Sequence, residues 1–209
     1  MKWLEFLQKF GSMPLFHSSM LEVFPSDLRQ IRVQLSRWVR AGKVARIRRE
    51  WYMVEKPWRV KEVPLAHIAT QIVQPSYLSQ EWALQYHGLI PDAVENPTCA
   101  TTDRPRIIQA LGRSFLYHHV QRDLLTGFAE VLIDGWPAPV AYAEKALFDM
   151  IYFHVQRNRF SLAWLAELRL QNLDEFDVTR LKSYAGKSAK WGLHAAVRSA
   201  AEFIEEERR

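Results

Sequence analysis

A run of basic side chains between residues 28 and 49 carries the clearest chemistry in this sequence. The run holds seven Arg, one Lys and no Asp or Glu. Arg and Gln side chains match the edges of guanine and adenine in the major groove, and an apolar side chain can contact the thymine methyl group. Arg and Lys also neutralise backbone phosphates. These residue types favour binding to double-stranded DNA; a solvated basic face without a partner is the alternative.

The spacing of apolar residues in this run predicts a helix from Asp27 to about Ala41 that ends at Gly42. Ser26 or Asp27 can cap its first turn. At about 100° per residue, one arc of the helix is apolar and should face the core. The residues on that arc are Leu28, Ile31, Leu35, Trp38 and Val39.

The opposite arc of this helix should face DNA. The residues that we expect to contact bases are Arg29, Gln30, Val33 and Arg37. Residues late in such a helix, and those in a following hairpin, usually contact phosphates or the minor groove. The residues that we expect to do so are Arg40, Lys43, Arg46, Arg48 and Arg49.

Two helices and a hairpin are predicted around this helix. Residues 2–10 place apolar side chains on one helical face, and residues 18–24 form a short helix. Residues 43–54 contain two short strands around a turn. Trp51 and Tyr52 should close the core of this unit rather than serve as exposed stacking platforms for RNA. The order of elements is that of a winged helix-turn-helix domain.

The charge distribution divides the chain. Residues 1–60 hold 12 Lys and Arg against 5 Asp and Glu, whereas the remainder holds 16 against 18. We therefore expect a winged helix-turn-helix domain over residues 1–56, a Pro- and charge-rich linker over 57–64, and a second domain over 65–209. The fold class expected for the whole chain is α+β.

The second domain is predicted to be mixed α+β and mainly helical. Its periodicity predicts helices near residues 65–73, 79–88, 143–156, 161–169, 175–185 and 190–207. It predicts strands within residues 97–102, 114–121, 127–134 and 137–141. His118 and His119 are adjacent in one of these strands, so we expect one to be packed and the other exposed.

A family resemblance is carried by motifs that follow one another along most of the chain. In the first part they are residues 35–49 (LSRWVRAGKVARIRR) and Trp51-Tyr52. In the second part they are 75–79 (PSYLS), Ala83-Leu84, 87–89 (HGL), 115–118 (FLYH), Thr126-Gly127 and 140–149 (VAYAEKALFD). In this order they resemble the AbiEi-type antitoxins, the regulator half of bacterial type IV toxin–antitoxin (abortive infection) systems.

The resemblance implies two functions. The first domain would repress its own operon by binding repeats in the promoter, so the expected partner is operator DNA. The second domain would counteract a cognate nucleotidyltransferase-like toxin, with or without direct contact. The sequence departs from the family at Glu50, where a Gly is usual. A Gly permits a positive φ in a tight turn, which a Glu resists, and a carboxylate there would repel phosphate.

The second domain shows no pattern of an active site. The sequence has no zinc-ligand spacing, no phosphate-binding loop, no nucleophile elbow and no Asp-x-Asp pair. Lys145 and Asp149 are four residues apart and should form a surface pair on a helix. Tyr77 and Ser79 should mark a helix entrance, with Ser79 as its cap. We therefore expect no enzyme activity, no metal and no cofactor.

The single cysteine, Cys99, and the lack of a long apolar run suggest a cytoplasmic protein with no membrane partner. Two alternatives remain open for the second domain. It could sense a ligand or mediate oligomerisation in a DNA-binding regulator without a toxin, or it could be an enzyme with a DNA-targeting domain.

Overall fold

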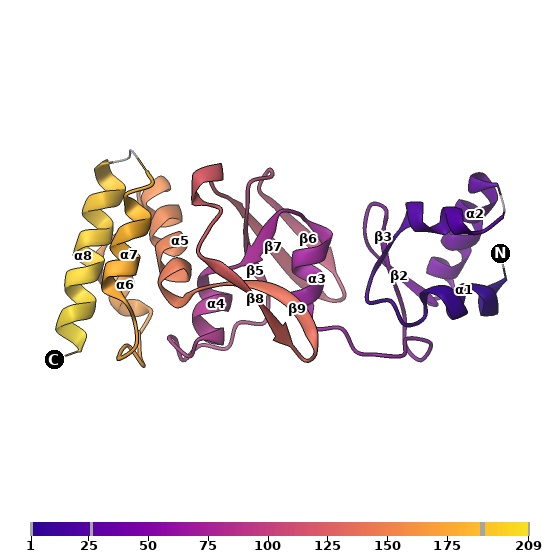
Figure 1. Cartoon of the computed structure of the whole chain (residues 1–209), viewed down its shortest axis with the longest axis horizontal. Coiled ribbons are helices and arrows are strands. Elements are labelled where there is room, and N and C mark those ends of the chain that lie inside the picture. The colour runs from indigo at the N-terminus through magenta and orange to yellow at the C-terminus, as the bar shows by residue number, and fades with distance from the viewer. Residues whose placement is uncertain (1, 26, 189–190, 209) are drawn as a thin grey trace.

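The computed structural model describes residues 2–25, 27–188 and 191–208 and shows a mixed α+β protein. Figure 1 shows an elongated molecule with the N-terminal elements at one end, a sheet in the middle and the C-terminal helices at the other end. Within the described ranges, no helix is both long and apolar enough to cross a membrane.

Helices and a small sheet form the N-terminal end. In chain order the elements are α1 (Trp3–Phe10), β1 (Phe16–His17), the 3₁₀ helix η1 (Ser18–Val23), α2 (Leu28–Arg40), β2 (Val44–Arg48) and β3 (Trp51–Val54). Strand β3 is central and pairs antiparallel with both β1 and β2. The helices cover one face of this sheet and enclose an aromatic-rich core that includes Phe6, Phe10 and Trp38.

A six-stranded sheet forms the middle of the molecule. Its strands are β4 (Ser76–Leu78), β5 (Thr98–Thr101), β6 (Arg106–Ala110), β7 (Arg113–His119), β8 (Phe128–Ile133) and β9 (Trp136–Ala141). They lie in the order β6-β7-β5-β4-β9-β8. The pairs β4/β9 and β5/β7 are parallel, and the others are antiparallel.

Helices cover both faces of this sheet. They are α3 (Leu65–Ile72), α4 (Gln80–Tyr86), α5 (Ala143–Gln156), α6 (Leu162–Glu167), α7 (Val178–Ala185) and α8 (Trp191–Glu207), with the short 3₁₀ helix η2 (Arg122–Leu124). Helix α3 lies on the face toward the N-terminal end, where the Tyr117 hydroxyl donates to the Ala69 carbonyl at 2.7 Å. Helix α5 lies on the other face, with α7 and α8 packed against it.

The β2–β3 hairpin contributes buried side chains to a hydrophobic core on each of its faces. Val44 and Val54 belong to the N-terminal core. Ile47 and Met53, 2% exposed each, belong instead to the large core of the second part of the chain. The segment predicted as a linker is also held in place, since the Trp136 indole N–H donates to the Glu62 carbonyl at 2.7 Å. The two parts of the chain therefore share a hydrophobic core through the hairpin.

Most elements predicted from the sequence are confirmed. All six helices expected after residue 64 are present, and so are the four expected strands and the β2–β3 hairpin. Strands β1, β4 and β6 were not predicted. His118 is half-buried against Phe153 and His119 is exposed, as their adjacent positions in a strand predict.

Candidate nucleic-acid interface

The amphipathic pattern of α2 positions the candidate interface. Its first turn is capped by Asp27, whose carboxylate accepts from the Arg29 backbone N–H at 2.9 Å; the alternative cap, Ser26, lies outside the described residues. Three apolar side chains fix the buried face: Ile31, Leu35 and Trp38. Leu28 was predicted to face the core but is 45% exposed, because the first turn of the helix extends beyond that core.

Six residues of the opposite face line one shallow surface depression: Arg29, Arg32, Val33, Ser36, Arg37 and Arg40. The structure thus brings together Arg29, Val33 and Arg37, which were expected to contact bases. Gln30 is exposed but lies outside this group. Arg32 was missed because its helical angle places it near the edge of the apolar arc.

The four arginines of α2 have no internal electrostatic partner. Within the described parts of the chain, their guanidinium groups make no ion pair or hydrogen bond. Arg29 lies in the first turn, where a positive charge opposes the helix dipole. Arg29/Arg32 and Arg37/Arg40 are like-charged neighbours one turn apart, each pair costing about 0.2–0.5 kcal/mol. Arg37 and Arg40 lie in the last turn, where a positive charge is favourable, so the like-charge repulsion is concentrated at the start of this face.

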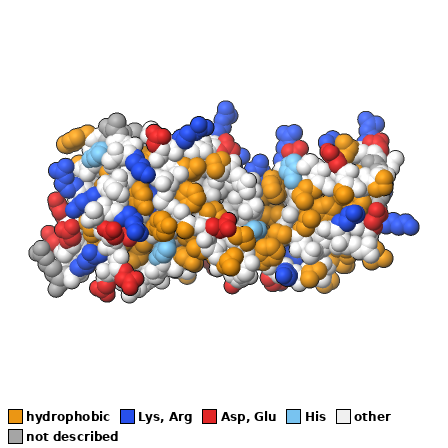
Figure 2. All heavy atoms as spheres, viewed as in Figure 1, with side chains coloured by type: hydrophobic (Ala, Val, Ile, Leu, Met, Phe, Trp, Pro, Cys, Tyr) orange, Lys and Arg blue, Asp and Glu red, His pale blue; other side chains and the backbone are white. Residues whose placement is uncertain are grey.

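Figure 2 shows Lys and Arg side chains protruding from the end of the molecule that the N-terminal elements form. Arg46 and Arg49, in the hairpin, are exposed. They remain available for a backbone contact together with Arg40, which is also exposed.

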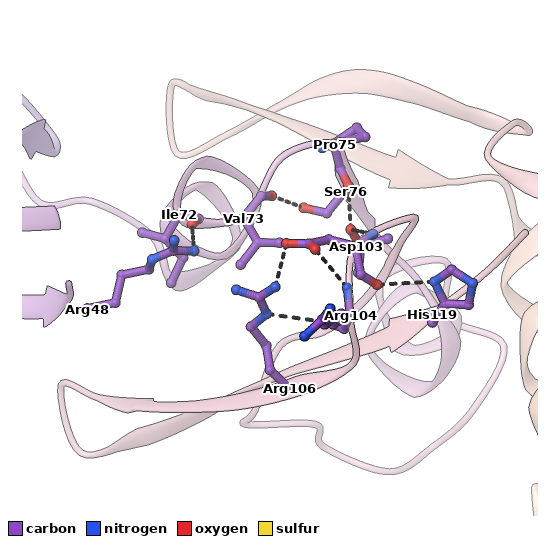
Figure 3. A network of polar contacts seen from close by, with 10 residues as sticks. Arg48, Ile72, Val73, Pro75, Ser76, Asp103, Arg104, Arg106 and His119 are labelled. Carbon is purple, nitrogen blue, oxygen red and sulfur yellow. Dashed lines mark hydrogen bonds and ion pairs between the residues drawn. The ribbon is translucent and has the colours of Figure 1, made fainter. Parts of the chain in front are cut away.

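Two residues expected to contact the DNA backbone are engaged within the protein. The Lys43 ammonium lies over the rings of Trp3 and Trp58, 5.1 and 5.7 Å from their centroids. Arg48 Nη1 donates to the Ile72 carbonyl at 2.5 Å, as Figure 3 shows. Arg48 therefore joins the hairpin to the end of α3 instead of pointing away from the protein.

The turn between β2 and β3 places Glu50 in a backbone conformation that is unfavourable for a residue with a side chain. Glu50 adopts a φ of +67°, in the left-handed region. The turn is held by a hydrogen bond from the Ser18 N–H to the Glu50 carbonyl at 2.8 Å. The Glu50 carboxylate lies 3.7 Å from His17 Nε2. The turn thus keeps the geometry that a Gly would favour, with a carboxylate at its tip.

The second part of the chain contains a buried polar cluster formed by Tyr77, Ser79, Lys145 and Asp149. Lys145 and Asp149 form an ion pair with both side chains 0% exposed, so the expected surface pair is wrong. Asp149 also accepts from the hydroxyls of Tyr77 at 2.8 Å and Ser79 at 2.7 Å. Ser79 therefore does not cap α4 with its side chain. The Lys145–Asp149 pair is buried because the first turns of α5 pack against the sheet.

Burial governs the titration of this cluster. It lowers the pKa of Lys145, and the charge of Asp149 opposes that effect. Burial raises the pKa of Tyr77, and the neighbouring Asp149 charge adds to the rise. The cluster has no opening to solvent, because Lys145, Asp149 and Ser79 are each 0% exposed. It holds α5 to β4 and offers no place for a substrate.

Across the described residues, no group of three or more His, Cys, Asp or Glu side chains could hold a metal ion. No protein-family model matches the chain, and a search of curated proteins found no match. The assignment of a function therefore depends on the geometry of the exposed surfaces and on the motifs of the sequence.

Proposed function

We propose that the chain is a double-stranded DNA-binding transcriptional repressor whose N-terminal part is a winged helix-turn-helix domain. The observation that carries this proposal is the exposed face of α2, where four arginines without internal partners surround Val33. Arginines suit guanine edges and phosphates, and Val33 can contact a thymine methyl group. The side chains that we assign to bases are Arg29, Gln30, Val33 and Arg37, and we add Arg32 because it lines the same face.

The topology of the N-terminal elements supports this proposal. A helix, a strand, a short helix, a longer helix and a hairpin follow in order, and the first strand pairs with the last. In helix-turn-helix proteins the second helix of the motif enters the major groove. We assign this role to α2, whose basic face is turned away from both hydrophobic cores.

For the second part of the chain we propose the role that the family resemblance implies. It would counteract a nucleotidyltransferase-like toxin encoded beside the protein, in an operon that the N-terminal part represses. The assay is growth of cells expressing the product of the neighbouring gene, with or without this protein. No rescue of growth by the folded protein would exclude an antitoxin role and leave the DNA-binding proposal intact.

The DNA proposal predicts a steep salt dependence of binding by the full chain. A protein that contacts about six phosphates loses roughly a thousandfold in affinity between 50 and 200 mM salt. Fluorescence anisotropy with labelled duplex DNA from the promoter region measures this salt dependence.

The same assay tests the residues of α2. The double variant R29A/R37A should weaken binding strongly. The matched control R159A/R198A also removes two exposed arginines, both outside the N-terminal elements, and should leave affinity unchanged. Affinity that is flat across this salt range would contradict the proposal.

A further inference from the structure

The two edges of the large sheet differ in what protects them. At one edge lies β6, and β2 of the hairpin packs against it. At the other edge lies β8, and β9 is the only described element that packs extensively against it. Strand β8 has six residues in unbroken register with β9, and none of them is Lys or Pro. Proteins commonly use these two residues, bulges or a covering element to prevent an edge strand from pairing with another chain. The edge of β8 is therefore open to a further strand.

The turn between β8 and β9 fixes which main-chain groups of β8 face outward. Ile133 and Trp136 are paired across the two-residue turn Asp134-Gly135, and the residues that flank such a turn exchange hydrogen bonds. At the other end of the strand, the Tyr142 N–H donates to the Gly127 carbonyl at 2.9 Å. The hydrogen bonds to β9 therefore fall on the odd-numbered residues. The N–H and C=O groups that face away from β9 belong to Phe128, Glu130 and Leu132.

These three residues also carry the exposed side chains of the strand. Leu132 is 72% exposed and Phe128 is 36% exposed. The Phe128 ring stacks on that of Tyr77, with 4.6 Å between the centroids. Glu130, between the two apolar residues, is exposed, as is Asp134 in the turn, and within the described ranges neither carboxylate forms an ion pair. An incoming strand thus meets two apolar side chains with an uncompensated negative charge between them.

We propose that the β8 edge binds an extended segment of another protein, in which a Lys or Arg stands between two apolar residues at every second position. The basic side chain would pair with Glu130, and the apolar ones would pack on Phe128 and Leu132, because directly opposite side chains of neighbouring strands contact each other. Main-chain hydrogen bonds would add the segment to the sheet as a further strand. The proposal does not depend on DNA binding.

A second copy of β8 fits this edge less well than a basic segment. Two antiparallel copies that place Phe128 opposite Leu132 also place Glu130 opposite Glu130, because these residues are evenly spaced along the strand. Like charges directly opposite each other are destabilising. The charge of this edge therefore favours a basic partner.

Two labelled peptides with blocked ends test the charge requirement on the full chain. Their sequences are KTITKTITK and KTITETITK, which have the same pattern in both directions, so the orientation of the added strand does not matter. In anisotropy titrations the first peptide should bind saturably and at least about fivefold more tightly than the second. E130K should reverse this preference. The control E206K reverses an exposed carboxylate on α8 and should leave it unchanged. Equal binding of both peptides, or an unchanged preference in E130K, would overturn the charge assignment, and no saturable binding would overturn the site.

A second pair of variants tests whether the peptide joins the sheet. L132P removes an outward N–H and leaves the hydrogen bonds to β9 in place, since Pro is tolerated on edge strands. L132A removes the same apolar side chain but keeps the N–H. We expect L132P to bind the first peptide about tenfold more weakly than L132A does, at a similar melting temperature. N-methylation of the central Lys of the peptide should weaken binding to the unaltered protein to a similar extent. Equal binding in both comparisons would show that no strand is added here.

Sedimentation velocity of the protein alone distinguishes the two possible occupants of the edge. The unaltered chain should remain monomeric at the concentrations used in the titrations. Self-association that L132P abolishes and L132A retains would overturn the proposal and assign this edge to a second copy of the chain.

Discussion

At the scale of single residues, the arginines of the N-terminal part have different expected roles. Arg37 lies on the exposed face of α2 that we assign to bases, whereas Arg49 lies at the hairpin turn. R37A should therefore cost about 1–3 kcal/mol on operator DNA and relax sequence specificity. R49A should weaken operator and random DNA by the same factor. Competition titrations with both DNAs measure the difference, and equal losses on both DNAs for both variants would refute the assignment of faces.

The turn residue Glu50 allows a test of backbone strain. At a φ of +67°, a side chain with a Cβ atom costs roughly 1–2 kcal/mol that Gly does not incur. E50G and E50A both remove the carboxylate and its contact with His17, so their difference reports the backbone alone. We expect the folded state of E50G to be more stable than that of E50A by about 1 kcal/mol in urea unfolding. Equal stabilities would mean that the turn changes conformation.

At the scale of elements, α5 packs on the sheet with an ion pair buried within the helix, and the Asp149 carboxylate of that pair accepts from Tyr77 of β4. K145M should destabilise the protein by about 3–5 kcal/mol, because it leaves the Asp149 carboxylate buried without its counter-charge. The same substitution at Lys182, whose pair with Glu205 is half-exposed, should cost at most about 1 kcal/mol. Chemical unfolding of both variants gives the comparison. A small loss for K145M would mean that the pair contributes little to the docking of α5.

Helices were easier to predict from this sequence than strands. Apolar spacing locates α2 and α5 to within a residue or two, because each carries several turns of periodic pattern. Strand β4, Ser76–Leu78, has three residues that are all buried, too few to show an alternation. Strand β6 was missed because its turn to β7 uses Leu111-Gly112, both at positive φ, instead of a typical Asn-Gly or Asp-Gly. Asp134-Gly135, between β8 and β9, is such a typical turn, and both of its strands were predicted.

The candidate interface was predictable in part because most of it lies on one periodic helix, α2. The angular position of a residue on α2 follows from the sequence, so most of its exposed face could be assigned. The partners of the hairpin side chains could not, because they come from distant segments. Arg48 bonds to Ile72, 24 residues away, and Lys145 lies against the rings of Tyr77 from β4 and Tyr184 from α7. Charge pattern alone does not distinguish such residues from exposed ones.

At the scale of the whole molecule, the hairpin joins the basic helix to the second part of the chain. Figure 3 shows Arg48 reaching the end of α3, near the ion pair between Asp103, in the loop before β6, and Arg106, the first residue of β6. Leu15, Ile47 and Met53 complete the large hydrophobic core from the N-terminal side. A cut near Val60 would expose this apolar surface, so an isolated 65–209 fragment should be less stable than the same residues in the full chain.

The shared core predicts that the two parts unfold as one cooperative unit. M53A should lower the stability of both parts by about 2–5 kcal/mol, because it leaves a cavity in a core that both build. Hydrogen exchange under mild denaturant measures this for the amides of α2 and α5 separately, and both should lose the same protection. L4A removes an apolar side chain that is 74% exposed and should change neither. If M53A left the protection of α5 unchanged, the two parts would be independent folding units, and DNA binding could be transferred without the second part.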